Sequence, residues 1–332
     1  MLHAAIRLAL AGVSLTAVSL AATALAAPAA PNLKSLQLPM TTLTPAATIT
    51  LGGSPDWTVV TPEAVWVSND KLRSVQRIDP RTNTVVATIP MRTAPCSGIA
   101  AGFGSIWVPL DGQPGGLARI DQESNRITRI LPFHPGNDEG GIAVSLDSVW
   151  MITDIRGTLL RIDPDSNVVT QTISLPPGSF NLLYNDGIVW VTGFESNVLI
   201  AVEAHSGEIL DTIPVGPHPR FLTAGHGSIW TLNQGDGSIT RVKMSSRRVL
   251  ATIPAGLPGH GGDICAGAGF IWATLSGVPL TKIDPTTNQV VRQWVGDGGD
   301  ELRFGLDSLW LTNLKAGLLW RIPAKAGPAN QP

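Results

Sequence analysis

Several features are scarce in this chain of 332 residues, and each scarcity excludes a class of protein. Charged residues make up 14% of the sequence, and the formal net charge is −2 without any Lys/Arg cluster. The chain therefore lacks the basic surface that binding to nucleic acid or to an anionic membrane requires. No C-x-x-C pair, G-x-S-x-G serine or P-loop occurs, which excludes zinc ribbons, covalent haem and the nucleophile and phosphate sites that those motifs form.

Aromatic residues other than tryptophan are also rare. The sequence has ten Trp but only seven Phe and one Tyr, together with 35 Gly and 26 Pro. The glycines and prolines indicate many turns, and the excess of tryptophan indicates a particular role for that residue.

The N-terminus has the organisation of a secretory signal. Arg7 precedes an apolar run from Leu8 to Leu25, and Ala24 and Ala26 form an A-x-A cleavage site. No cysteine stands directly after this site. We therefore expect a signal peptide over 1–26 and a Pro/Ala-rich leader over 27–45. The mature protein should be periplasmic or secreted, without membrane insertion after cleavage and without a lipid anchor.

Seven tryptophans recur at a nearly constant spacing. Intervals of 41, 43, 40, 40, 42 and 38 residues separate Trp66, Trp107, Trp150, Trp190, Trp230, Trp272 and Trp310. Each lies in a short apolar segment such as "SIWVP" that we expect to be a strand buried between neighbouring units. A period near 40 residues in strand-rich units is typical of a β-propeller.

Each unit is expected to contain four strands. A third strand often ends in "RID", and a turn such as "DPRTN" or "DPTTN" leads to a fourth strand such as "TVVATIP". Asp can close such a turn on its own backbone, Pro presets φ, and Asn tolerates the left-handed conformation. The pattern predicts an all-β, seven-bladed β-propeller with four antiparallel strands per blade.

The two ends of the chain complement one another. The last unit stops after its third strand, at "GLLWRIPA", while an extra strand "AATITLG" (46–52) precedes the first unit. Pairing this N-terminal strand with the last blade would close the ring and leave no open sheet edge. The propeller should then span 46–323, with a flexible tail over 324–332. In such a ring Cys96 and Cys265 enter nearly opposite sides, beyond the roughly 7 Å that a disulfide permits.

The repeat resembles a known exported family. "VWVSND" and "VQRIDPRTNTVVATIPM" resemble the YVTN-type propeller repeat, with Trp66 where that repeat often has Tyr. The streptogramin B (virginiamycin B) lyases are more distantly similar through their G-x-I-W strands. The resemblance implies the fold over the whole mature ring, whereas an activity depends on the site.

Inter-blade loops should gather around one mouth of the channel, together with the loops between second and third strands. The positions twelve and nine residues before each Trp hold Ser54, Pro95, Asp138, Gly178, His218, His260 and Gly298, and Trp57, Gly98, Gly141, Asn181, Phe221, Asp263 and Glu301. Glu139, Arg220 and Asp300 lie near these positions, and Arg156 and Glu195 belong to the loops between second and third strands. Carboxylates predominate, so a cation or metal is a more natural guest than an anion.

Two histidines and two carboxylates fall in three consecutive blades. His218, His260 and Glu301 could bind a divalent metal such as Mg²⁺, and the same residues with Asp263 could act as catalytic base and acid. "GPHPRFL" and "PGHGGDI" are also good turn sequences, so both histidines could be ordinary loop residues. Asp263 and Glu301 could equally bond the backbone of neighbouring blades.

The resemblance to the lyases implies a more specific arrangement and then departs from it. Those enzymes place one histidine in each of two neighbouring blades, with glutamates and magnesium nearby, and His218 and His260 resemble that pair. Pro258 and "ATLSG" (273–277) stand where the glutamates would be.

Three hypotheses follow, each for a monomer. The first is an exported propeller that binds a small ligand, a metal or a periplasmic partner protein on an acidic loop face, through Trp57, Asp138, Glu139, Arg156, Glu195, Arg220 and Asp300. The second is a metal-dependent lyase or hydrolase of small cyclic molecules that uses His218, His260, Asp263 and Glu301. The third, by analogy of fold, is an accessory propeller of a periplasmic redox system.

Overall fold

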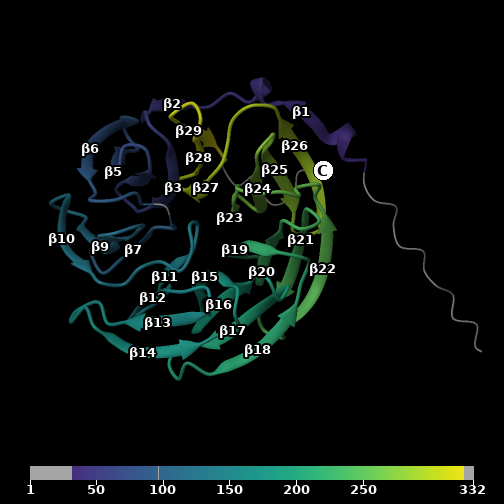
Figure 1. The fold of residues 1–332 in the computed structure, drawn as a ribbon. Helices are drawn as coiled ribbons and strands as arrows, with labels where there is room; N and C mark the ends of the chain where they lie inside the picture. Colours follow the sequence, from purple (N-terminus) through teal and green to yellow (C-terminus); the bar gives the residue numbers. More distant parts are fainter. Residues whose placement is uncertain (1–31, 96, 325–332) are drawn as a thin grey trace, which may run out of the picture. The chain divides into compact units, whose positions relative to one another are not determined.

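Seven four-stranded blades form a closed ring around a central channel (Figure 1). The computed structural model describes residues 32–95 and 97–324; the predicted signal peptide, Cys96 and residues 325–332 lie outside them. In each blade the strands run antiparallel from the channel outwards, and the innermost strands contact one another in a complete circle, with β27 contacting β3. The predicted propeller is confirmed.

The inner two strands of each blade surround the channel. The first strands are β3 (Pro55–Val60), β7 (Ala100–Gly102), β11 (Ile142–Val144), β15 (Ser179–Asn185), β19 (Pro219–Gly225), β23 (Ile264–Gly267) and β27 (Leu302–Gly305). The second strands are β4 (Val65–Asn69), β8 (Ser105–Leu110), β12 (Val149–Ile152), β16 (Ile188–Gly193), β20 (Ser228–Asn233), β24 (Phe270–Leu275) and β28 (Ser308–Asn313).

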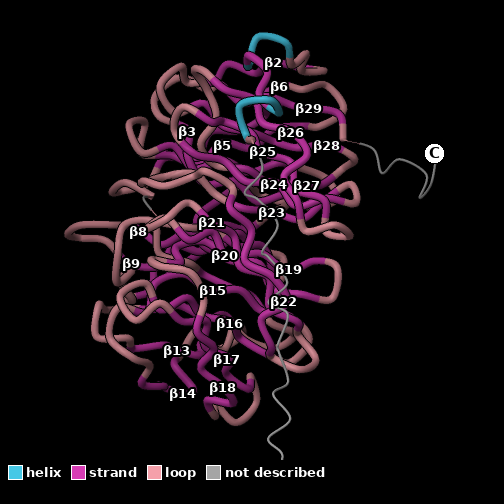
Figure 2. Tube along the Cα trace, turned by 90° about the vertical axis from the view of Figure 1, so that its right-hand side faces the viewer, coloured by secondary structure: helices cyan, strands magenta, loops and turns pink. Residues whose placement is uncertain are grey.

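The outer two strands complete the blades. The third strands are β5 (Ser74–Asp79), β9 (Gly116–Asp121), β13 (Thr158–Ile162), β17 (Val198–Glu203), β21 (Ser238–Lys243), β25 (Val278–Asp284) and β29 (Leu318–Pro323). The fourth strands are β6 (Thr84–Pro90), β10 (Arg126–Leu131), β14 (Val169–Ser174), β18 (Ile209–Pro214), β22 (Arg248–Pro254), β26 (Gln289–Val295) and, for blade 7, β2 (Ala47–Thr50). Seen from the side, loops and turns lie at both ends of the strands (Figure 2).

The N-terminal segment contributes more than the closing strand. β2 pairs antiparallel with β29, as expected, and closes blade 7. Residues 32–45, which the sequence assigns to a leader, also contain two short 3₁₀ helices, η1 (Leu33–Leu36) and η2 (Met40–Thr42), and a strand, β1 (Gln37–Pro39). β1 pairs parallel with β26 and so covers the outer edge of blade 6.

The repeated tryptophans pack between blades, as the sequence predicts. All seven are at most 6% exposed. The second strands that carry them are buried along almost their whole length, because a neighbouring blade covers each face. Cys265 in β23 is also buried.

We call the face that carries the turns between first and second and between third and fourth strands the turn face. The predicted Asp–Asn turns form there: the N–H of Arg81 donates to Asp79 Oδ1 over 2.8 Å, and Asn83 has a φ of 57°. The opposite face, with the inter-blade loops and the loops between second and third strands, is the loop face.

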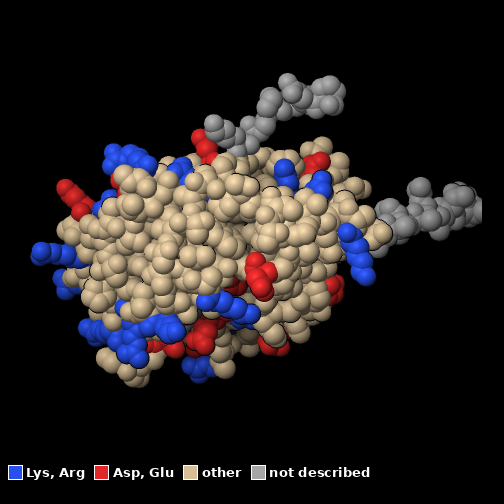
Figure 3. Space-filling view, turned by 90° about the horizontal axis from the view of Figure 1, so that it is seen from above, with Lys and Arg blue, Asp and Glu red and all other residues tan. Residues whose placement is uncertain are grey.

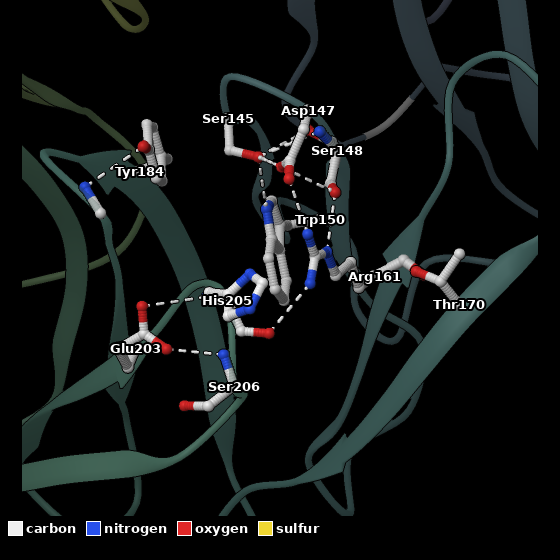
Figure 4. Close-up of polar contacts among 11 residues, drawn as sticks. Ser145, Asp147, Ser148, Trp150, Arg161, Thr170, Tyr184, Glu203, His205 and Ser206 are labelled. Carbon is white, nitrogen blue, oxygen red and sulfur yellow. Dashed lines mark hydrogen bonds and ion pairs between the residues drawn. The ribbon is translucent and has the colours of Figure 1, made fainter.

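An arginine joins consecutive blades on the turn face. In blade 3, the Arg161 guanidinium lies over Trp150, with Cζ 5.6 Å from the ring centroid, and its Nη1 donates to the His205 carbonyl in the turn of blade 4 (Figure 4). The same arrangement recurs in blades 1, 2, 5 and 7 through Arg77, Arg119, Arg241 and Arg321. Arg321 reaches the Pro80 carbonyl and thereby ties the last blade to the first.

Charged side chains are sparse on the surface. In the view of Figure 3 most of the surface is uncharged, and Lys/Arg and Asp/Glu side chains are interspersed. No helix in the described segments is long and apolar enough to cross a membrane.

Candidate functional site at the loop-face mouth of the channel

The inner strands enclose a cavity of about 310 Å³, and all seven contribute to its wall. Of the positions nine residues before the repeated tryptophans, those that line it are Trp57, Gly98, Gly141, Asn181 and Asp263. The sequence register therefore identifies the ring of residues at which the loop face opens into the channel.

A recurring hydroxyl holds several of these residues in place. The backbone N–H of Trp57, Asn181, Asp263 and Glu301 donates to the hydroxyl of Ser68, Thr192, Thr274 and Thr312, respectively, over 2.7–3.1 Å. Each hydroxyl stands two residues after the repeated Trp, on the adjacent second strand. This Ser/Thr two residues after the Trp is a signal in the sequence that was not used in the prediction of the site.

Arg303, on β27, is the cation in the wall of the cavity. Its Nη1 donates to Asp263 Oδ2 and lies 3.0 Å from Glu301 Oε1. Both carboxylates are 2% exposed, whereas the Arg303 side chain is 31% exposed. Asp263 and Glu301 thus hold a guanidinium and orient it toward the cavity, and Glu301 also accepts a hydrogen bond from the backbone of Thr58 in the neighbouring blade, as the backbone-bonding alternative predicts.

Burial changes the proton affinity of this cluster. Burial lowers the pKa of Arg303 to about 10. Burial also raises the pKa of Glu301 well above its ordinary range, and repulsion from Asp56 and Asp300 adds to the rise. A charge on Glu301 is therefore costly unless a cation is close to it.

Three further carboxyl groups influence one another at the mouth. Burial, followed by repulsion from Asp70, Asp300 and Glu139, raises the pKa of Asp56 well above its ordinary value. Burial and the charges of Asp138 and Glu139 raise the pKa of Asp70 to about 6. Burial raises the pKa of Asp300, although a hydrogen bond from the Gly262 N–H, 2.9 Å long, opposes the rise.

Arg220, on β19 of blade 5, is surrounded by aromatic rings. Its Cζ is 4.6 Å from the ring centroid of Phe180, 5.8 Å from that of Phe194 and 5.7 Å from that of Phe221. An ion pair joins Arg220 to Glu139, which is 81 residues away in the sequence. Arg220 Nε is buried without a hydrogen-bond partner among the described residues. Three of the seven phenylalanines in the chain thus gather around one guanidinium.

This surround reaches the cavity through Trp57. The ring of Phe221 meets that of Trp57 edge to face, with centroids 5.9 Å apart, and the Arg303 guanidinium lies over the Trp57 ring, with Cζ 6.0 Å from the ring centroid. Trp57 is 3% exposed, and its Nε1 has no hydrogen-bond partner within the described residues.

The two predicted histidines are exposed loop residues. His218 stacks on Phe194, with ring centroids 4.7 Å apart, and adopts a φ of 52°. His260 follows Gly259 in the loop before β23. Neither contacts Glu301, which is buried against Arg303. Across residues 32–95 and 97–324, no three His, Cys, Asp or Glu side chains are grouped so that they could hold a metal ion.

The remaining predicted ligand contacts lie outside the cavity wall. Asp138 and Glu195 are exposed on loops, and Arg156 is exposed and lies 3.6 Å from Asp154. Arg303, Phe180 and Phe194 were not among the predicted residues. Alternation along β27 could have indicated Arg303, because it stands two residues after Glu301.

Comparison with known proteins supports the fold. No protein-family model and no curated protein matches the sequence. A virginiamycin B lyase from Staphylococcus aureus superposes with a TM-score of 0.69 at 17% identity, covering 83% of this chain and 98% of the lyase. A streptogramin B lyase structure gives a TM-score of 0.68 at 17% identity, covering 82% and 93% of the two chains.

A third solved structure with a similar fold is not described as a lyase. U3-55K superposes with a TM-score of 0.70 at 13% identity, covering 84% of this chain and all of U3-55K. At such identities the likeness shows a shared fold and leaves the activity open. The chain is a seven-bladed β-propeller with streptogramin B lyase-like structural neighbours.

Proposed function

We propose that this protein is an exported binding propeller that takes a small organic cation at the loop-face mouth of its channel. One observation carries the proposal. Asp56, Asp70, Asp300 and Glu301 crowd the mouth, and burial, followed by repulsion from neighbouring carboxylates, raises the pKa of Asp56, Asp70 and Glu301. A bound cation would relieve that repulsion.

The cations already at the mouth are engaged. Arg220 pairs with Glu139, and Arg303 pairs with Asp263 and Glu301. The other carboxyl groups, once ionised, therefore give the mouth a negative field that attracts positive charge from solution.

An organic cation suits this mouth better than a metal ion. The rings of Trp57, Phe180 and Phe194 already lie beside guanidinium groups, and a protonated amine would gain the same cation–π attraction as well as hydrogen bonds to carboxylates. The export that the proposal assumes is supported by the signal-like N-terminus, and mass spectrometry of the mature protein should find Ala27 as its first residue.

Calorimetric titration of mature protein with putrescine and with spermidine tests the proposal. We expect binding with release of protons near pH 6, because a cation lowers the raised carboxyl pKa values; titration in two buffers of different ionisation enthalpy measures that release. Asp56→Asn/Asp300→Asn should weaken binding at least tenfold. Asp147→Asn, on the turn face, is the matched control and should bind normally.

The anionic probe glutarate supplies the opposite test. Binding of glutarate but of neither amine would overturn the proposal, as would amine binding that the Asp56→Asn/Asp300→Asn variant retains in full.

The second candidate is a metal-dependent lyase or hydrolase of small cyclic molecules at the same mouth. Its support is the likeness to the two lyase structures together with His218, which stacks on the aromatic surround. Thermal unfolding after chelation and again with Mg²⁺, Mn²⁺, Zn²⁺ or Ca²⁺ tests it. A metal-specific rise in Tm that His218→Ala/His260→Ala abolishes would favour the enzyme, since only binding to the folded state raises stability.

A further inference from the structure

Two seams of the turn face lack the repeated arginine, because blade 4 has Ala201 opposite Trp190 and blade 6 has Lys282 opposite Trp272. At the seam between blades 6 and 7 the arrangement also lacks its turn. Blade 7 takes its fourth strand, β2, from the N-terminus, so no turn between third and fourth strands follows β29 among the described residues. Ala324 occupies the position at which other blades place the turn residues Pro80, Gln122, Pro164 and Pro285. In four other seams the carbonyl at that position accepts a hydrogen bond from the arginine of the preceding blade.

The preceding blade carries a lysine in place of that arginine. Lys282 lies opposite Trp272 in the register of β24 and β25, as Arg241 lies opposite Trp230 in blade 5. Its Nζ lies 3.5 Å from the ring centroid of Phe270 and 5.2 Å from that of Trp272. Within residues 32–95 and 97–324 this ammonium has no hydrogen bond and no ion pair.

The space left by the missing turn is a cavity of about 240 Å³ between blades 6 and 7. Its wall includes Phe270, Trp272 and Trp294 on one side, Leu43 from the N-terminal segment, and Ala324 at the end of β29. Lys282 is the charged residue of that wall. The cavity is therefore lined by aromatic rings and by one ammonium group that has no acceptor among the described residues.

Such a group is stabilised by a negatively charged partner. A partly buried ammonium without an acceptor is costly, and an ion pair in an apolar surround repays that cost. Burial lowers the pKa of Lys282, and repulsion from Arg292 adds to this effect against the attraction of Asp284. An anion in the cavity would restore that pKa toward its ordinary value.

We propose that this cavity is a second binding site, separate from the channel mouth, for a small carboxylate with an aromatic or apolar body. The carboxylate pairs with Lys282, as a turn carbonyl pairs with the arginine in the other seams, and the body packs against Phe270, Trp272 and Trp294. The site does not depend on the function proposed for the loop face.

Saturation-transfer NMR and calorimetric titration of the full mature chain with phenylacetate test this site. Phenylacetate should bind, and benzyl alcohol, which has a similar ring but no charge, should bind at least tenfold more weakly. Lys282→Met should reduce phenylacetate affinity at least tenfold, whereas Lys282→Arg should retain most of it. Lys243→Met, an exposed lysine in the third strand of blade 5, is the matched control and should not change binding.

Three results would overturn the proposal. The first is equal binding of phenylacetate and benzyl alcohol, which would make the cavity a merely apolar one. The second is unchanged phenylacetate affinity in a Lys282→Met protein whose thermal unfolding shows that it folds. The third is binding only after deletion of residues 325–332, which would mean that the C-terminal segment occupies the cavity.

Discussion

The turn face and the loop face of this ring are built on opposite principles. On the turn face, five blades use the same arginine, tryptophan and turn to join the next blade. On the loop face, the position nine residues before each Trp holds a different side chain in almost every blade, including Trp57, Asp263 and Glu301. Repetition supplies what every blade needs for packing, and the unrepeated positions are those available for a site.

The two faces also treat charge differently. On the turn face, Arg161 Nη2 lies 2.7 Å from Asp147 Oδ2, and the partners are open to solvent on one side. On the loop face, Asp263 and Glu301 are buried, and their one shared cation is Arg303. The contribution of the turn face to stability should therefore depend on packing, whereas that of the loop face should change with pH.

Loss of one repeated tryptophan should have the largest effect. Trp150 is fully buried, and its Nε1 donates to Ser145 Oγ over 3.1 Å. Trp150→Ala should lower the free energy of unfolding by about 4 kcal/mol through lost burial and a cavity. Urea unfolding followed by circular dichroism measures it. Ile155→Ala, at a side chain that is 67% exposed, is the control, and a loss as large there would contradict the packing argument.

Removal of the loop-face cation should be the next largest effect. Arg303→Met leaves Asp263 and Glu301 buried without their partner and should cost about 3 kcal/mol at pH 8. The cost should shrink toward pH 5, because the raised pKa of Glu301 lets it take up a proton. Urea unfolding at both pH values measures the difference. A cost that is equal at both pH values would contradict the buried-charge interpretation.

The pH dependence of Asp70 should be a smaller effect. Its pKa is raised to about 6 in the folded protein from an ordinary 3.8. The group therefore favours the folded state fully below pH 3.8, and that contribution disappears as the pH rises through 6. After allowance for partial exposure, Asp70→Asn should remove about 1–2 kcal/mol of the loss in stability that the parent protein shows between pH 4 and pH 7.

Parallel urea titrations of parent and Asp70→Asn proteins at the two pH values give this quantity directly. If both proteins lose equal stability over the interval, Asp70 is not the group that titrates.

Replacement of one turn-face arginine by lysine should have the smallest effect on stability. Arg241 donates through Nε to Ser228 and through Nη1 to Asn288 and Pro285, which a lysine cannot do at once. Arg241→Lys should cost about 1 kcal/mol. Lys282→Arg, at the seam that lacks the turn, should change stability by less, and thermal unfolding of the pair checks the order.

Much of the fold could be predicted, because its signals are local or periodic. The 40-residue spacing identified the blades, and the surplus strand at 46–52 identified the partner of β29. The parallel pairing of β1 with β26 was missed, because a three-residue strand has no periodicity of its own. The predicted signal peptide and the pairing state of Cys96 concern residues outside the described segments and remain predictions.

The site could be predicted in position but only partly in composition. The register placed Trp57, Asp263 and Glu301 around the mouth, since their distance from the repeated Trp is constant. It could not show that Arg303 joins two of them, nor that Glu139 and Arg220 meet across 81 residues.

By itself the sequence determined the number of blades, their order and the closure of the ring, because each follows from short-range patterning repeated along the chain. The tertiary structure decided which charges are buried, which cation they share and where an ammonium lacks its acceptor. Those properties depend on desolvation and on distances between residues far apart in sequence, and neither leaves a mark in the periodic pattern.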